Sequence, residues 1–522
     1  MAFDRSQGEV ELDLDQVQGD VLVGLQKDFQ WFIGFTIADV AKFKIFLKNL
    51  TPHLTTARTV LEREFLIQAQ HTAKKHDRLN FIGTNIGFTI TGLQALGVAD
   101  LSQISDTSFK NGLAQQSAGL GDPASGAGAP SQWVVGGTNQ VLHGLLLITG
   151  PSKDSVDHAR TVISDLAGTS WTVVYDELGL TRAQDRGHEH FGFLDGVSQP
   201  SVRGQIDQFF PHRKFLTPAQ NPDDPGQGLP GSDLLWPGAF VFGYPSQQSA
   251  DMDNPGPAVD GGLGWMKNGT FMVFRRLKQL VPEFDAFVAA SAATLNMDAD
   301  LLAARMVGRW KSGAPMVTTP LQDDPTLAED DLLVNDFEFS QDAAGRRCPY
   351  AAHIRKSYPR NDITPAGTAK TNDFDRRAAS EANTQTRRIM RRGIPFGGDV
   401  GDDEAEQEKT LIDRGLMFVC YQSSIAGQFE FILQAWVNNP GFPPASGGKA
   451  GFDPILGQAG ADPLLGRPGT DNRARNFGGA VVNYPTGPTG DPITLASDFI
   501  VPTGGGYFLV PSIDAVETVL AA

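Results

Sequence analysis

The sequence predicts an α+β protein with two ferredoxin-like lobes, in which helices flank antiparallel sheets. Strand-like and helix-like runs follow the order β-α-β-β-α-β in the first part of the chain, and similar runs return after residue 217. Glycine (58 residues) and proline (33 residues) are frequent, so we expect long connections between these elements.

The elements of the first lobe follow from local residue patterns. Residues 29–37 are rich in aromatic and β-branched side chains, which favour a buried strand. In residues 40–50, apolar side chains recur at helical spacing. The other predicted elements are a strand at 80–90, a short helix at 91–98, a strand at 141–149, a helix at 154–168 and a strand at 171–177.

A Pro/Gly-rich connection at 217–233 separates this lobe from the second, so we divide the chain into lobes 1–216 and 217–522. The second lobe has predicted strands at 239–245, 270–277 and 416–424, a helical region from Glu283 to Arg309, and an amphipathic helix beginning at Phe429. We expect a polar insert, 367–388, and an acidic insert, 401–409, to be solvated surface.

Composition excludes several functional classes. A net charge of −17 argues against nucleic acid or an anionic membrane surface as the main partner. No apolar run is long enough to cross a bilayer, and the acidic start shows no signal core. The pairing of Cys348 with Cys420 and glycosylation at the sequons of Asn49 and Asn268 are left open.

Asp195 stands in an unusual place, within the stretch HFGFLDGVSQP (190–200). Burying a carboxylate costs several kcal/mol unless it is paired or hydrogen-bonded. A partner is available in RRIMRRGIPFGG (387–398), where Arg391 and Arg392 stand at the edge of a predicted turn. Arginine beside a buried carboxylate holds that group ionised. The alternative for this segment is a solvated basic helix end.

His353 lies in CPYAAHIRKSYPRND (348–362), after small and apolar residues and before Arg355, Lys356 and Arg360. A buried imidazole beside clustered cations suits a metal in an anionic macrocycle, because the imidazole binds the metal and the cations pair with propionates. An ordinary basic loop is the alternative. His188 and His190 form an HxH pair that would share one face of a strand, but no third metal ligand is evident.

The segments GFLDG (192–196), HIRKSYPR (353–360) and RRGIPFG (391–397), in this order, resemble the dye-decolorizing peroxidases. These are heme enzymes with two ferredoxin-like lobes in one chain. The resemblance runs from QGDVLVGLQKD (18–28) to GGGYFLVPSI (504–513), and the length and inserts are most similar to the long fungal branch. It implies that both lobes pack as one unit around one non-covalent heme b.

The resemblance also implies a role for particular residues. His353 corresponds to the proximal ligand of the heme iron, and Asp453 corresponds to a carboxylate that accepts a hydrogen bond from it. Asp195 and Arg391 correspond to the distal pair. The other implied heme contacts are Leu416 and Phe418 as apolar distal lining and Arg355 and Arg360 as partners of the propionates.

The implied reaction is the oxidation of bulky dyes and phenolic, lignin-related aromatics by hydrogen peroxide, in one-electron steps through a high-valent oxo-iron state. Asp195 would carry the peroxide proton and Arg391 would stabilise the leaving oxygen. Trp436 matches an exposed electron relay of some fungal members, the alternative being an aromatic packed in the core. Phe396 stands where some relatives have a tyrosine, so a relay is doubtful there.

Several alternatives stay open. A heme carrier or iron-release protein on the same fold would need His353 but no distal pair, and an interaction protein would need no heme. The acidic insert could bind manganese through Asp399, Asp402, Asp403 and Glu404, although such runs are usually solvated loops. Secretion is implied by the resemblance, with a cytoplasmic protein as the alternative, and the oligomeric state is open between monomer and dimer.

Overall fold

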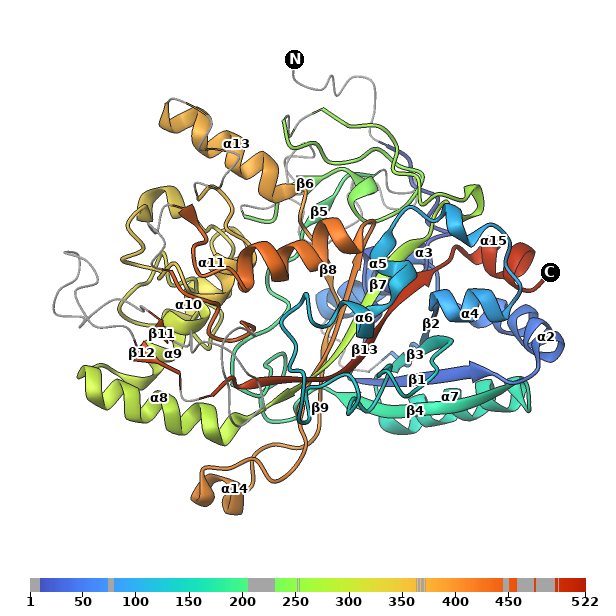
Figure 1. Ribbon diagram of the computed structural model, residues 1–522, viewed down its shortest axis with the longest axis horizontal. Coiled ribbons are helices and arrows are strands. Elements are labelled where there is room, and N and C mark those ends of the chain that lie inside the picture. The colour runs from blue at the N-terminus through green and yellow to red at the C-terminus, as the bar shows by residue number, and fades with distance from the viewer. Residues whose placement is uncertain are drawn as a thin grey trace.

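The computed structural model describes residues 10–522 except for 74–78, 205–230, 251, 253, 363, 365–366, 368–369, 371, 445–449, 458–473, 476–492 and 496. The elements are arranged along a central set of long strands (Figure 1). Helix α2 (Val40–Leu50) lies at one end of this view and helix α8 (Val281–Leu295) lies at the other. The predicted boundary between residues 216 and 217 lies outside the described residues.

The first lobe has the predicted β-α-β-β-α-β order, and its strands pair antiparallel in the order β4-β1-β3-β2. This is the ferredoxin-like arrangement, so the prediction for this lobe is confirmed. Its elements are β1 Phe29–Ile37, α2, β2 Gly83–Phe88, α4 Ile90–Ala95, β3 Gly144–Gly150, α7 Lys153–Ala167 and β4 Trp171–Leu180.

The second lobe repeats this order, with β13 beside β7, β7 beside β10, and both β9 and β8 on the other edge of β10. The predicted helical region of this lobe is divided, because Asn296 adopts a left-handed conformation and Asp298 caps a new helix. The elements are β7 Thr270–Gln279, α8, α9 Ala299–Val307, α11 His353–Ser357, β8 Met390–Arg391, β9 Ile394–Phe396, β10 Gly415–Gln422 and β13 Ile500–Val510.

The two lobes share one sheet. Strand β13 also pairs with β2 at Leu509 and Phe88, and β4 pairs with β9 at Gly179 and Phe396. Because β10 pairs back to β7, the sheet closes on itself as a barrel. The predicted α+β class is therefore confirmed, and shared edges are what hold the lobes together as one unit.

Alternating side chains of the barrel strands enter two different cores. On β7, Met272 and Phe274 belong to the cluster that also contains Phe32 of β1 and Phe508 of β13. Their neighbours Phe271 and Val273 belong to a cluster with side chains of the covering helices, such as Phe43 of α2. Both faces are apolar because successive side chains of a strand point to opposite faces and each face is covered.

Two predictions about local structure are wrong. Residues 239–245 form no strand; a 3₁₀ turn, Pro237–Ala239, is followed by further turns, and Gly243 has a φ of 89°. Proline and a glycine with positive φ both disfavour a regular strand. The polar insert 367–388 is not solvated surface either, because side chains such as Ser380 and Thr384 are fully buried. The acidic insert 401–409 is exposed as predicted, except that Glu404 in α14 (Asp402–Gln407) is 2% exposed and forms an ion pair with Arg414.

The remaining described elements are shorter or peripheral. The polar insert contains α13, which lies at the top of Figure 1. The helix predicted to begin at Phe429 is part of two π-helical segments that begin at Ile425. These elements are α1 Gly19–Leu22, α3 Ala57–Thr72, α5 Thr107–Asn111, α6 Leu113–Gln116, β5 Ser201–Val202, β6 Leu234–Leu235, α10 Pro325–Ala328, α13 Asp373–Gln385, η7 Ile425–Glu430, η8 Ile432–Val437, β11 Ala474–Arg475, β12 Ile493–Thr494, α15 Ile513–Ala515 and η11 Val516–Leu520.

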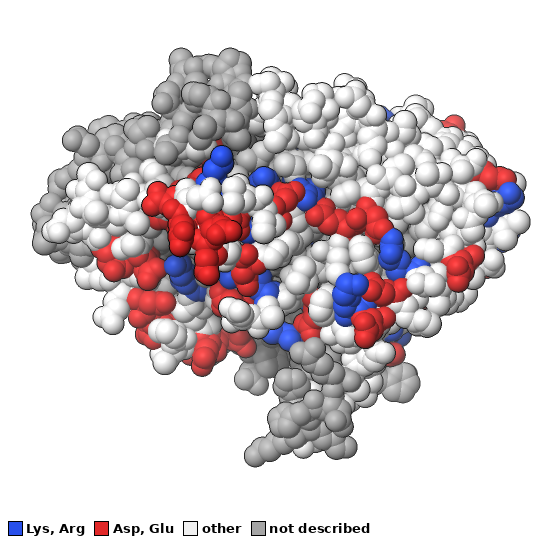
Figure 2. Space-filling model, turned by 90° about the horizontal axis from the view of Figure 1, so that it is seen from below, with Lys and Arg blue, Asp and Glu red and all other residues white. Residues whose placement is uncertain are grey.

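The structure answers some of the open questions about the surface. Asp and Glu gather on the lower face of the molecule, with Lys and Arg among them (Figure 2). Cys348 and Cys420 are both buried and free. Asn49 is exposed, but Asn268 is buried and its side-chain oxygen accepts a 2.6 Å hydrogen bond from Tyr244. Within the described residues, no helix combines the length and hydropathy that a bilayer span requires.

Candidate functional site

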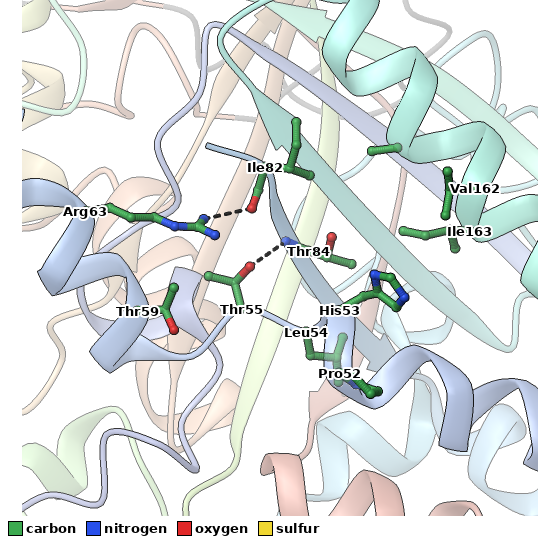
Figure 3. A pocket seen from close by; sticks show the side chains of 11 residues that line it. Pro52, His53, Leu54, Thr55, Thr59, Arg63, Ile82, Thr84, Val162 and Ile163 are labelled. Carbon is green, nitrogen blue, oxygen red and sulfur yellow. Dashed lines mark hydrogen bonds between the residues drawn. The ribbon is translucent and has the colours of Figure 1, made fainter. Parts of the chain in front are cut away.

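Cavity size alone does not identify the site. A cavity of about 390 Å³ lies in the first lobe (Figure 3), lined by side chains such as His53, Thr55, Arg63 and Val162. Arg63 there donates to the Ile82 carbonyl at 2.7 Å. A second cavity, of about 270 Å³, is lined by six of the residues that the sequence singled out: Asp195, His353, Arg360, Arg391, Leu416 and Phe418. The chemistry of its lining selects the second cavity.

Asp195 and Arg391 meet at the wall of this cavity, as predicted. Arg391 Nη1 donates to Asp195 Oδ1 at 2.9 Å, and both side chains are about one-third exposed. The Gly196 amide donates to the same carboxylate oxygen at 2.7 Å. On the arginine side, Gln199 bonds both main-chain groups of Arg391. Two segments almost two hundred residues apart in sequence are thus fixed against one another.

His353 lies at the start of α11 on the same cavity, and its second nitrogen is oriented by a buried carboxylate. His353 Nδ1 and Asp453 Oδ2 are 2.8 Å apart, so Nε2 is the nitrogen left for a ligand. Asp453 also accepts from the amides of Ile455 and Leu456 at 2.8 and 2.9 Å. Burial raises the pKa of Asp453, but His353 and these amides outweigh it and hold that pKa below its ordinary value.

Apolar side chains form much of the cavity wall. Leu416 and Phe418 are two residues apart on β10 and both line the cavity, which fits the period of a strand. Phe191 and Phe193 line it from the loop that carries Asp195. The two expected apolar residues are therefore where the sequence predicted them.

The cavity carries buried cations that lack an anionic partner among the described residues. Arg360 donates only to the Tyr358 carbonyl and the Ser198 hydroxyl, both at 3.4 Å, and its Nε has no hydrogen-bond partner. Arg309 donates only to two carbonyls and the Asn335 side chain. Burial lowers the pKa of Arg360 to about 10 and lowers that of Arg309 as well. An anion in the cavity would compensate both, so the lining fits a macrocycle with propionates.

Arg355, expected at the propionates, is elsewhere. It does not line the cavity, and all five of its N–H groups are used by Asp342, Asp362 and the Cys348 carbonyl. The predicted role is wrong because two buried carboxylates saturate this guanidinium. Arg309, to which the sequence analysis assigned no role, lines the cavity instead.

The exposed position predicted for Trp436 is also wrong. Its side chain is 2% exposed and stacks on Phe442 with ring centroids 5.5 Å apart. Phe431 packs edge-on against its ring. The structure favours the alternative, an aromatic packed in the core, because Trp436 is one of the buried residues of the π-helical segment η8.

The two proposed metal sites outside the cavity do not form. His188 and His190 lie in a loop, where His188 Nε2 is 3.1 Å from the Lys311 carbonyl and His190 Nε2 is 2.9 Å from the Phe396 carbonyl. The acids of the insert are not gathered either, and the described part of the chain contains no group of three potential metal ligands. Glu189, between the two histidines, does line the cavity, and no local sequence pattern indicates this, because its position depends on tertiary packing.

Family models match most of the chain. The model described as the DyP dimeric alpha+beta barrel domain matches residues 16–183. The model described as Dyp-type peroxidase, C-terminal, matches residues 239–441. The first contains the strands of the first lobe, and the second contains His353 and Arg391.

Individual relatives agree with these models. Peroxidase 2 of Mycetinis scorodonius is 35% identical, over 98% of this chain and 88% of its own. A dye-decolorizing peroxidase of Mycena epipterygia is 34% identical over the same shares. Among solved structures, a variant of the Pleurotus ostreatus dye-decolorizing peroxidase gives a TM-score of 0.78 at 34% identity, over 98% of this chain and 100% of that one. A dye-decolorizing peroxidase complexed with 2,6-dimethoxyphenol gives 0.74 at 33% identity, with the same coverage.

Proposed function

Because this chain belongs to the dye-decolorizing peroxidase family, a family of hydrogen-peroxide-dependent peroxidases, we propose that it oxidises bulky dyes and phenolic, lignin-related aromatics in one-electron steps. The observation that carries the proposal is a single cavity that joins Asp195–Arg391 to His353–Asp453. A solved relative complexed with 2,6-dimethoxyphenol supports the phenolic part. We also propose an extracellular enzyme, on the likeness of this chain to fungal dye-decolorizing peroxidases.

Heme b fits this cavity through its ligand, its walls and its charges. His353 Nε2 would bind the iron, and Asp453 would hold the imidazole ring in place through Nδ1. Arg360 and Arg309 would pair with the propionates. When bound, heme supplies the iron centre at which peroxide is reduced and electrons are taken from the substrate.

Asp195 transfers the peroxide proton, and Arg391 stabilises the negative charge that develops on peroxide. Asp195 Oδ2, which is free of the Arg391 contact, takes the proton from one peroxide oxygen and returns it to the other. Arg391 donates to the oxygen on which negative charge develops as the O–O bond breaks. Leu416 and Phe418 exclude water beside the pair, which strengthens both interactions.

The direct test is dye oxidation by the purified protein loaded with heme. We expect loss of dye colour that requires both heme and hydrogen peroxide. A protein that binds heme through His353 but leaves the dye unchanged when peroxide is added would instead be a heme carrier.

Replacing Arg360 and Arg355 should separate heme binding from folding. We expect Arg360→Leu to weaken heme retention about tenfold or more, because a propionate loses its buried partner. Arg355→Leu leaves Asp342 and Asp362 buried without their cation and should lower the free energy of unfolding by about 3 kcal/mol. Heme transfer to an apoglobin and urea unfolding of the apoprotein measure the two effects; equal heme loss in both variants would contradict the assignment.

Replacing Trp436 should leave the oxidation of bulky dyes unchanged. Since the indole is buried against Phe442, a dye cannot reach it from solvent. We expect Trp436→Phe to keep the ratio of kcat/KM for an anthraquinone dye to that for a small phenol. A selective loss of the dye reaction would show that Trp436 carries electrons despite its burial.

A further inference from the structure

Glu189 is a half-buried carboxyl group that lines the same cavity as Asp195 but has a different environment. Its two oxygens accept from the amides of Phe191 and Phe193, both at 2.9 Å, and close a tight turn immediately before Asp195. Gln279, the last residue of β7, donates its side-chain N–H₂ to the same carboxyl. In the described part of the chain, no Lys, Arg or His side chain forms an ion pair with Glu189.

The partner residue Gln279 has an unused acceptor. Its side chain is 2% exposed, and its Oε1 is buried without a hydrogen-bond partner in the structure. A side-chain amide can present either its oxygen or its N–H₂ group after a half-turn. Gln279 can therefore donate to an ionised Glu189 or accept the proton of a neutral one. Both states of the carboxyl group are satisfied by the same neighbour.

We propose that Glu189, with Gln279, is a positioning residue of the peroxide reaction: the pair holds the turn that presents Asp195 to the cavity and keeps a further carboxyl group there without adding an unpaired negative charge. The proposal rests on the proposed function for its role in the reaction. Asp195 is tied to the other side of the same loop, since its amide donates to the Gly187 carbonyl at 2.9 Å. The position of Asp195 thus depends on both ends of the turn.

The charges around Glu189 agree with a neutral group in acid. Burial raises the pKa of Glu189 to about 7 and outweighs the two amides and Gln279, which lower it, while Asp195 adds repulsion. The nearby Arg182 does not pair with the Glu189 carboxyl group. It donates a 2.7 Å hydrogen bond to the Glu189 main-chain carbonyl and forms ion pairs with Asp399 and Asp185. His190 next to it is held neutral, because burial lowers its pKa to about 4.

The reaction with peroxide should be faster in acid than in alkali. Below about pH 7 Glu189 is neutral, Asp195 is paired with Arg391, and the cavity accepts negative charge developing on peroxide. Above this pH Glu189 ionises, and its carboxylate, which has no cationic partner among the described residues, opposes the negative charge that develops on peroxide. Folding stability falls in the same direction between about pH 4.5 and 7, because the folded state binds the proton more tightly than the unfolded chain does.

Infrared titration and kinetics of the heme-loaded protein test this proposal with Glu189→Gln, which keeps the size of the side chain and removes its charge. Burial also raises the pKa of Glu381 to about 7, so Glu189 is identified by the difference between the two spectra. We expect the carbonyl intensity that is lost near pH 7 to be smaller by one carboxyl group in Glu189→Gln. The alkaline decline in the second-order rate constant for peroxide should vanish in the same variant. Glu430→Gln is the matched control, since Glu430 is buried, accepts from Ser108 and Tyr507, and does not line the cavity.

A second variant guards against misfolding of the first. Gln279→Met removes the donor to the ionised carboxyl group, so the infrared transition should move to higher pH. A carbonyl band of undiminished intensity in Glu189→Gln, or an alkaline decline that is unchanged in it, would overturn the proposal. If the infrared transition of the unsubstituted protein is as expected but the protein never reacts with peroxide, the proposed function is wrong. The role of Glu189 and Gln279 in the reaction is then wrong as well.

Discussion

Asp195→Asn should slow the reaction with hydrogen peroxide on the order of 10²–10⁴-fold. Asparagine has nearly the same shape and can still accept from Arg391 and from the Gly196 amide, which now bond Asp195 Oδ1. It cannot take a proton at the second oxygen position. The loss should therefore fall on proton transfer, with heme binding and the heme absorption spectrum unchanged, and stopped-flow measurement of the second-order rate constant checks it.

The control for this prediction removes a different carboxylate of the same cavity. Asp122 lines the cavity and pairs with Arg275 at 2.9 Å. We expect Asp122→Asn to react with peroxide at close to the rate of the unsubstituted protein. Equal losses in the two variants would indicate a general effect of cavity charge and would contradict the assignment of the proton to Asp195.

Arg391→Leu should slow the same step on the order of 10²–10³-fold, the usual effect of removing one preorganised donor to developing negative charge. It also leaves Asp195 without its cation in a cavity of low polarity. Arg391→Lys should recover part of the rate, because it restores the charge without the two-pronged geometry. The measurement is again the rate constant for peroxide, with heme content determined separately.

The double variant distinguishes one functional unit from two independent residues. If the pair acts together, Asp195→Asn combined with Arg391→Leu should be about as slow as the slower single variant. Multiplication of the two losses would show independent roles. A fast reaction in Asp195→Asn beside a collapsed one in Arg391→Leu would remove the aspartate from the mechanism.

The fold could be predicted from sequence where local pattern and burial agree. Strand 29–37 and helix 40–50 coincide with β1 and α2, because aromatic runs and helical spacing reflect the final packing. The strand predicted at residues 239–245 does not form, because Gly243 and the flanking prolines require turns although the run is apolar. The closure of the sheet through single pairings such as Gly179 with Phe396 leaves no local signal at all.

In the candidate site, too, residues in motifs could be predicted, whereas residues whose roles depend on tertiary contacts could not. Asp195, Arg391, His353 and Asp453 were found from their motifs, and the structure brings each pair within 2.9 Å. Arg355 was misassigned because sequence proximity to His353 does not say which carboxylates lie around a guanidinium; Asp342 and Asp362 take it instead. Glu189, Arg309 and Gln279 were missed because their roles depend on burial and on partners far away in the chain.

The absorption spectrum of the heme-loaded protein, recorded before and after one equivalent of hydrogen peroxide, tests the central claim most directly. We expect a ferric heme band that depends on His353 and that changes within the mixing time when peroxide is added, more slowly in Asp195→Asn. A heme band that ignores peroxide would contradict the peroxidase function and favour a carrier. No heme band after reconstitution would contradict the assignment of His353 and of the cavity itself.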